Sequence, residues 1–476
     1  MRHAVIMIMS TICLVAVDLM AGDIVPSPAI QQAPFSLTLS VDASGIVPDA
    51  PSADIPTGAL TLGDCVRIGL QKSPIGQSAH EAVIGAREST AVAKAPYWPA
   101  VGFSAGYSRW QRHIFLPSGL GQPGQTLPSL VGPTDDYSFS LNATYLLWDS
   151  GERKAQLGVV KAKQQGSEYE EQKARQDLAL AVHKAYYDYE SAIEMLAAAK
   201  TSLSRAEDHV KIAKVRKQAG VVPLSDVLRA EVEASSAHLA LVRAEGAARL
   251  SRGKLATTMG LPVETPVEIA APAGPLEPPD ETELAYALDQ SILLRPVVKA
   301  AEQGVDAAKR GVDSARSAWG PKVNAVASYG REDSQWWPQD KNWMAGVVVS
   351  IPVFTGFSRI HNVARAKADL ARSGFDLDQV KLEVRQQVWN AFSTVKEAYD
   401  SVRTSETLVQ SATESLRLAR ERYEVGAGTI TDLLDSEDAL ARAEASLVAT
   451  KGNLRAAWSQ YRWSMGNLFI ESSNAK

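Results

Sequence analysis

Short segments in which apolar and polar residues alternate occur in two pairs along the chain. The clearest has apolar Tyr137, Phe139, Leu141, Ala143, Tyr145 and Leu147 alternating with polar Ser138, Ser140, Asn142 and Thr144. The other three have their apolar positions within Val101–Tyr107, Val323–Tyr329 and Trp343–Ile351. A period of two is typical of strands with one apolar face. We therefore predict two β-hairpins, 100–148 and 322–354, whose strands of about 10–12 residues are long enough to cross a bilayer when tilted.

Between these segments the chain has long stretches with helical periodicity. One predicted helix precedes each hairpin, at 62–94 and 284–318, and Pro99 or Pro321 ends it. A very long helix follows each hairpin, at 152–219 and 358–425; at 1.5 Å per residue it would be roughly 100 Å long. The last helix carries Leu433, Leu440, Leu447, Leu454 and Tyr461 at intervals of seven. This spacing predicts a left-handed coiled coil.

The chain is an internal duplication, because landmark residues recur at fixed offsets. Pro74 and Pro99 recur 222 positions later, and Gly220 and Asp226 recur 206 positions later. The two offsets differ because the first copy contains an extra loop rich in Pro and Gly, 117–133. We divide the chain into repeat 1 (61–260), a Pro-rich linker (261–282), repeat 2 (283–466) and a C-terminal tail (467–476).

The N-terminus has the features of an export signal. Arg2 and His3 precede an apolar stretch from Ala4 to Val17, which is shorter than the roughly 20 residues that span a bilayer. We predict a signal peptide at 1–21 and a Pro-rich extension at 22–60; a buried N-terminal strand is the alternative. Cleavage would remove Cys13 and leave Cys65 alone, so no intrachain disulfide or cysteine metal cluster is expected.

Composition and motifs argue against several classes of protein. The net charge is −5, without a basic run that would favour nucleic acid. The seven histidines are scattered, and no nucleophile elbow occurs. We therefore expect no enzyme, no cofactor, no metal site and no nucleic-acid partner.

Four strands are too few to close a membrane barrel, since the smallest known have eight. A dimer would supply eight strands, whose interior side chains just about fill the barrel. A trimer would supply twelve and leave a bore, which suits the small polar face of Ser138, Ser140, Asn142, Asn324 and Ser328. A soluble β-sandwich would also alternate, but strands between such long helices in an exported chain favour a barrel.

Taken together, residues 60–468 resemble the TolC family of outer-membrane efflux proteins. The resemblance rests on the duplication, the helix–Pro–strand entry, the turns Trp148–Gly151 and Phe354–Gly356, and the segment Arg422–Asp435. It implies a mainly α-helical chain with a trimeric twelve-stranded transmembrane β-barrel, four strands per chain, continued by a periplasmic α-helical barrel. The implied function is a passive outer-membrane exit duct of a tripartite efflux or type I secretion system in a Gram-negative bacterium.

The resemblance also implies partners: a homotrimer, outer-membrane lipid, a periplasmic membrane-fusion adaptor and an inner-membrane pump of the RND or ABC class. In each repeat a glycine, Gly220 or Gly426, separates the long helix from the last helix, so that the two form a helical hairpin with this turn at its tip. In the family such turns dock the adaptor, which implies that role here for Gly220, Val221, Gly426, Ala427 and Thr429. A periplasmic coiled-coil structural or adaptor protein without a membrane barrel is the alternative function.

Asp432 and Asp435 share one face of the predicted last helix. The residues alone favour carboxylates that complement the helix dipole. The resemblance instead implies that they form the constricted periplasmic gate, where a trimer would gather six carboxylates. It also implies that Tyr423 latches this gate, with Asp226 and Ser225 as partners on the neighbouring hairpin.

Two residues depart from the family pattern. The best-studied members carry a latch arginine where this chain has Gly428, so we expect its closed gate to be held differently. Pro223 is unusual in the tip of repeat 1.

Overall fold

The computed structural model describes residues 58–109, 135–270, 278 and 280–468. The predicted signal peptide, most of the Pro-rich extension, the 117–133 loop and most of the C-terminal tail lie outside these residues. We describe below the unit that begins at Ala53.

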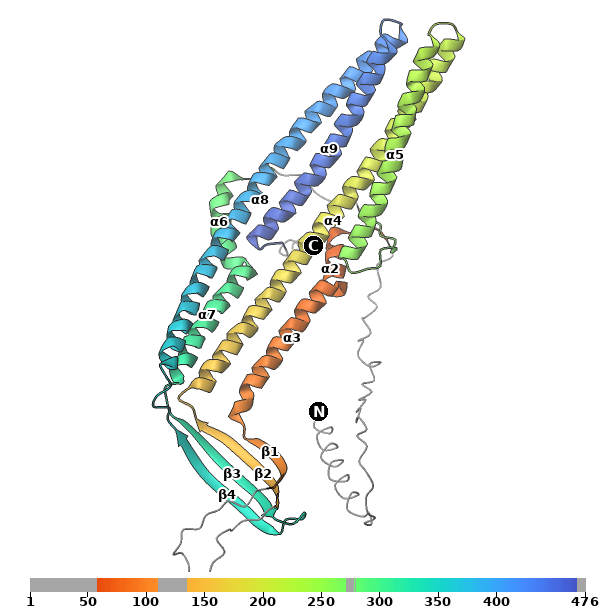
Figure 1. Ribbon diagram of the computed structural model, residues 1–476. Helices are drawn as coiled ribbons and strands as arrows, with labels where there is room; N and C mark the ends of the chain where they lie inside the picture. The colour runs from red at the N-terminus through yellow and green to blue at the C-terminus, as the bar shows by residue number, and fades with distance from the viewer. Residues whose placement is uncertain (1–57, 110–134, 271–277, 279, 469–476) are drawn as a thin grey trace, which may run out of the picture. The chain divides into compact units, whose positions relative to one another are not determined.

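One antiparallel sheet contains the strands of both repeats (Figure 1). Its order is β1-β2-β3-β4, with bounds Ala100–Arg109, Asp135–Trp148, Lys322–Asp333 and Asp340–Ser350. β2 of repeat 1 pairs with β3 of repeat 2, so the hairpins of the two repeats join into one continuous sheet. β1 and β4 each have a neighbour on one side only.

The register gives the sheet one polar and one apolar face. On the polar face Ser104 lies opposite Ser140, and the Asn142 amide donates to both hydroxyls at 3.0 and 3.1 Å. On the other face a row crosses all four strands: Phe103, Leu141, Tyr329 and Trp343. Phe103 and Trp343 are both 71% exposed, so no described residue of the chain covers the apolar face here.

Each repeat contributes four α-helices to the described chain. In repeat 1 they are α2 Leu62–Lys72, α3 Pro74–Lys94, α4 Glu152–Gln218 and α5 Leu224–Thr258. In repeat 2 they are α6 Leu284–Leu294, α7 Pro296–Ser317, α8 Ser358–Glu424 and α9 Ile430–Met465. The prediction of a mainly helical, duplicated chain with four strands is confirmed, and no described helix is apolar enough over a sufficient length to span a membrane.

The single helix predicted before each hairpin is wrong, because two helices stand there. Pro74 and Pro296 each occupy the first turn of the second helix, and the preceding Ser73 and Arg295 are extended. Proline excludes the residue before it from helical backbone geometry, and it has no N–H to continue the helix. The chain therefore bends at both sites.

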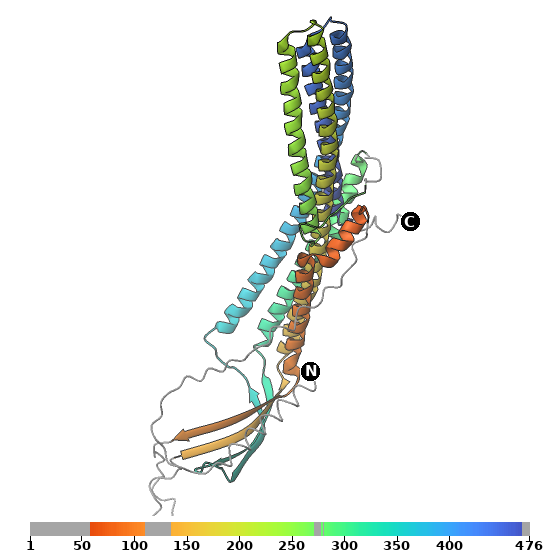
Figure 2. The same ribbon diagram turned by 90° about the vertical axis from the view of Figure 1, so that its right-hand side faces the viewer.

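Matching core clusters hold the helices of each repeat together. In repeat 1 Val182 and Tyr186 of α4 pack with Leu255 of α5. Their counterparts 206 positions later, Val388, Phe392 and Tyr461, form the core between α8 and α9. The two long hairpins α4–α5 and α8–α9 therefore share one packing scheme, and α4 also packs against α9 (Figure 2).

Candidate functional site

The two helical hairpins end in turns of the same design. After α8, Gly426 has φ +77°, and the N–H groups of Gly426 and Ala427 donate to the carbonyls of Tyr423 and Arg422 at 3.1 and 2.8 Å. After α4, Gly220 has φ +72°, and the N–H groups of Gly220 and Val221 donate to the carbonyls of Lys217 and Arg216 in the same way. This arrangement satisfies the last carbonyls of a helix and requires a left-handed residue, which glycine adopts without strain.

The turn into α9 is closed by reciprocal hydrogen bonds. The Asp432 N–H donates to Thr429 Oγ1, and the Thr429 N–H donates to Asp432 Oδ2, both at 3.1 Å. Bonds from the Thr429 hydroxyl and then from its backbone keep the pKa of the exposed Asp432 carboxyl below its ordinary value. Asp432 therefore completes the capping box at the start of α9.

Asp435 differs from Asp432, although both carboxylates are exposed near the tip. No hydrogen bond or ion pair of the Asp435 side chain occurs within the described residues, so its charge is uncompensated.

The tip of repeat 1 lacks the corresponding cap. Pro223 occupies the N-cap position of α5 and offers no side-chain acceptor. Ser225 Oγ approaches its neighbour Asp226 at 3.4 Å. The two tips therefore share their turns but differ in how the following helix begins.

Tyr423 does not contact the partners expected for it within the chain. Its side chain is 5% exposed, and its hydroxyl has no hydrogen-bond partner among the described residues, whereas Asp226 and Ser225 contact each other. The side chain that meets Tyr423 is Arg216 of α4, with its guanidinium carbon 4.6 Å from the ring centre. Arg216 also donates to the carbonyls of Tyr423 and Glu424 at 2.8 and 2.7 Å.

Arg216 is well suited to this position by its charge. The last carbonyls of a helix are unsatisfied acceptors and carry the negative end of the helix dipole. A guanidinium that binds two of them and lies over an aromatic face gains both hydrogen bonds and a cation–π contact. Arg216 thus fastens the end of α8 to α4.

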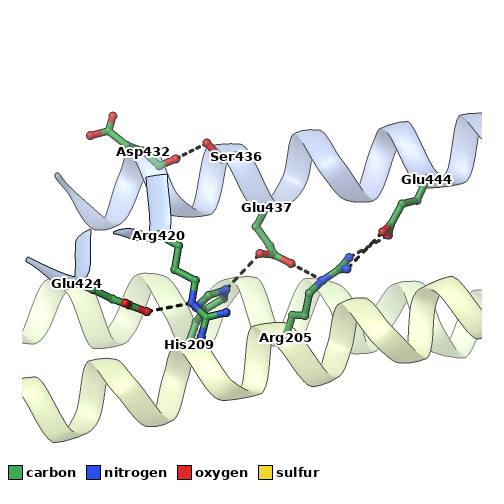
Figure 3. Close-up of polar contacts among 8 residues, drawn as sticks. All are labelled: Arg205, His209, Arg420, Glu424, Asp432, Ser436, Glu437 and Glu444. Atoms are coloured by element: carbon green, nitrogen blue, oxygen red, sulfur yellow. Dashed lines mark hydrogen bonds and ion pairs between the residues drawn. The ribbon is translucent and has the colours of Figure 1, made fainter. Parts of the chain in front are cut away.

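A second link between the hairpins is a partly buried ionic cluster of α4 and α9 (Figure 3). Arg205 Nε lies 2.6 Å from Glu437 Oε1, and Arg205 Nη2 lies 2.9 Å from Glu444 Oε2. His209 Nε2 lies 3.2 Å from the other Glu437 oxygen. The Glu437 side chain is only 3% exposed, so its charge depends on these partners.

Sequence reasoning missed Arg205, His209, Arg216 and Glu437. A signal was present in α9, where Glu437 and Glu444 lie seven residues apart beside the leucine stripe. A repeated carboxylate at that spacing marks a second seam facing another helix. Nothing in the sequence, however, identifies α4 as the helix that meets it.

The predicted docking turns lie on the surface. Gly220, Val221, Gly426, Ala427 and Thr429 are all exposed, and apolar side chains accompany them: Val221 is 65% and Val425 79% exposed. A Cβ added at Gly220 or Gly426 would meet no atom within 4 Å. Among the described residues no group of His, Cys, Asp and Glu is placed to hold a metal ion.

Comparison with known proteins agrees with this architecture. The chain is 29% identical over 384 residues to Protein CyaE of Bordetella pertussis, which covers 79% of this chain and 78% of CyaE. It is 22% identical over 424 residues to the alkaline protease secretion protein AprF of Pseudomonas aeruginosa, covering 86% and 85% of the two chains. The solved structure of the outer-membrane channel OprN superposes with a TM-score of 0.71 at 21% identity, covering 85% of this chain and 90% of that one.

The duplication is also visible in the family match. The sequence profile described as "Outer membrane efflux protein" matches twice, over residues 70–261 and 287–467, once in each repeat. These ranges include the long hairpins, both tips and the strands between them. The chain therefore belongs to the outer membrane efflux protein family, and the resemblance inferred from its repeats and tip segment is confirmed.

Proposed function

We propose that three copies of this chain form a passive exit duct through the outer membrane and periplasm. The observation that carries the proposal is the sheet: a four-stranded antiparallel sheet with two free edges and one exposed apolar face. An exposed sheet edge presents unpaired backbone groups, which proteins pair or cover. Pairing β4 of each copy with β1 of the next would remove all edges in a ring of twelve strands.

The strands have the dimensions and polarity that a membrane requires. They contain 10, 14, 12 and 11 residues, against the 9–11 or so that a tilted strand needs. The apolar row of Phe103, Leu141, Tyr329 and Trp343 would face lipid, and the hydroxyl-rich face around Ser140 would line the bore. A periplasmic coiled coil without a barrel would leave this apolar face in water.

A second surface favours association of copies in the helical part. Leu228, Val232, Leu239 and Val242 of α5 are 49–70% exposed and follow coiled-coil spacing. The partner within the chain, α4, covers the opposite seam through Val227 and Ala230. A neighbouring copy would cover the exposed seam and continue the helical wall.

We infer that the tips receive a periplasmic adaptor, and that an inner-membrane pump supplies the energy. Val221, Leu224 and Val425 leave apolar side chains exposed beside the two glycine turns, as expected of a protein-docking surface. AprF is named for protease secretion, and OprN is described as an outer-membrane channel. Export of a protein and export of smaller molecules are both compatible with a passive duct.

The gate is proposed at the same tips. Asp432 and Asp435 of three copies would bring six carboxylates toward one axis. Tyr423, Asp226 and Ser225 would lie at the junctions between hairpins there. Support comes from the exposure of the carboxylates and from the position of Tyr423 between α8 and α4.

Cross-linking tests the ring directly. The experiment combines Ser104→Cys on β1 with single cysteines at successive positions of β4, and mild oxidation follows. Cysteines whose Cα atoms approach within about 7 Å can bridge, so one β4 position should yield covalent trimers on a denaturing gel. Cys65 is buried and should not interfere.

Single-cysteine variants are the controls and should stay monomeric on the gel. The mass of the detergent-solubilised protein should correspond to three chains. A monomer, or a protein that stays soluble without detergent, would refute the proposal.

A further inference from the structure

Two cations face one another across β3 and β4, at the end of the sheet remote from the helices. Arg331 lies directly opposite Lys341 in the register. Both belong to the apolar face, because Arg331 also lies opposite Phe139 of β2. Residues paired in this way have Cβ atoms about 5 Å apart, and like charges there destabilise the sheet.

Neither charge is compensated within the described chain, because the carboxylates nearby are otherwise engaged. Asp135 accepts a hydrogen bond from the Tyr107 hydroxyl at 3.0 Å and lies 3.7 Å from Arg109. Asp333 accepts from the backbone N–H groups of the following turn. Among the residues that the structure describes, no ion pair or hydrogen bond engages the side chain of Arg331 or of Lys341.

Other carboxylates of this strand pair lie on the opposite face. Glu332 and Asp340 oppose one another in the register, one position out of step with the two cations. Glu332 accepts from the Asn342 amide at 3.1 Å on that face. They cannot neutralise a cation pair on the apolar face.

Aromatic side chains gather at the same end of the sheet as the cation pair. The rings of Trp336 and Trp337, in the β3–β4 turn, lie 5.5 Å from Tyr137 and 6.1 Å from Phe139. Trp and Tyr gather where the apolar layer of a membrane meets its headgroups. Arg331 and Lys341 therefore lie where the apolar face ends, on the side of the sheet remote from the helices.

We propose that Arg331 and Lys341 bind the phosphate group of a membrane lipid in the outer leaflet. The inference rests on the proposed function, which places this end of the sheet at the outer surface. An arginine fork can bind two phosphate oxygens while the lysine supplies a point charge, and the anion relieves the repulsion between them. The acyl chains of the same lipid would lie along the row that includes Leu141 and Trp343.

The test uses the full-length protein purified in detergent, with diphosphoryl lipid A as the probe. Native mass spectrometry counts bound lipids, and thermal unfolding measures the stabilisation. Lipid A should bind the wild-type protein and raise its Tm. The double variant Arg331→Gln/Lys341→Gln should bind at least about tenfold more weakly, because its charge-assisted bonds are lost.

Lys322→Gln is the matched control. Lys322 begins the same strand but lies at the helical end, where it is paired with Glu152. Its variant should bind lipid A as the wild type does. Without lipid, the double variant should unfold at the same temperature as the wild type or higher, because a repulsion has been removed.

Three results would overturn the site: equal binding by the double variant, equal binding of dephosphorylated lipid A, or an equal Tm shift from inorganic phosphate at the same concentration. The oligomeric mass in the same spectra separates the two proposals. A trimer without selective lipid binding contradicts this inference alone, whereas the absence of a trimer contradicts the proposed function.

Discussion

Arg216 on α4 lies over the Tyr423 ring of α8 at 4.6 Å and binds the Tyr423 backbone carbonyl at 2.8 Å. The same side chain therefore holds both the aromatic surface and the helix end. Family resemblance predicts a latch at Tyr423, and Gly428 removes the usual arginine. We expect Arg216, on the neighbouring hairpin, to hold the closed tip in its place.

We expect Arg216→Met to loosen the closed tips. Methionine keeps much of the apolar stem but loses two charge-assisted hydrogen bonds, each typically worth about 1.5–3 kcal/mol. In planar bilayers the variant should show a larger resting conductance and more frequent opening. Lys217→Met, which changes the next, exposed cation, is the control. Unchanged closed-state conductance in Arg216→Met would exclude Arg216 as a latch.

We expect Asp432→Asn/Asp435→Asn to reduce cation selectivity and block by polyvalent cations. A ring of carboxylates in a narrow, water-filled constriction attracts cations strongly, because the confined water screens their charges poorly. Asp435→Asn alone should show part of the effect without disturbing the Thr429 cap. Asp438→Asn, on the same helix but paired with Arg442 at 2.7 Å, is the control. Identical selectivity and block in the wild type and the double variant would leave these residues as helix-start carboxylates only.

The fold could largely be predicted because its signals are local and repeated. Alternation around Tyr137 and the seven-residue spacing from Leu433 to Tyr461 depend only on neighbouring residues, and the duplication supplied each signal twice. The same local rules should have identified the bends at Pro74 and Pro296.

The candidate site could be predicted only in part. Gly220, Gly426 and the Thr429–Asp432 cap follow from short-range rules of helix ends. The contacts of Arg216 and Glu437 depend on how α4 packs against α8 and α9, which are some 200 residues away in sequence. Periodicity shows that a helix has a buried face but not which helix covers it.

We expect Gly426→Trp to abolish export while the protein still assembles. The added ring would project into open space at the turn and block a partner helix, because no atom lies within 4 Å of a new Cβ. Gly426→Ala is the matched control, since it imposes the same left-handed strain of about 1–2 kcal/mol without the bulk. The measurement is export by a strain that lacks the native chain, with the oligomeric mass recorded in parallel. Normal export by Gly426→Trp would refute the docking role.

We expect Glu437→Ala to destabilise the protein by about 3 kcal/mol, because it leaves Arg205 and His209 without their buried partner. Glu444→Ala should be milder, at about 1 kcal/mol or less, since Glu444 is 29% exposed. Thermal unfolding in detergent, with a lower Tm for Glu437→Ala, is the measurement. Equal shifts for the two variants would contradict a special role for the buried carboxylate.

Acid should destabilise the α4–α9 contact through His183. Burial lowers the pKa of His183 to about 4 from 6.5, and its ring lies 3.0 Å from Ser459 Oγ. The folded state thus favours neutral imidazole, so this stability is present above pH 6.5 and is lost as pH falls toward 4. His183→Asn should flatten the loss of Tm across this window, whereas His238→Asn, at an exposed site, should not. Parallel profiles for all three proteins would contradict the assignment.

The free edges of β1 and β4 also have a genetic consequence. If only the closed ring satisfies those edges, every working duct draws on three chains at once. A cell making equal amounts of intact chain and a chain that assembles but cannot conduct would build only about one ring in eight from intact chains alone. Such an allele would behave as dominant, although the change itself is a loss of function.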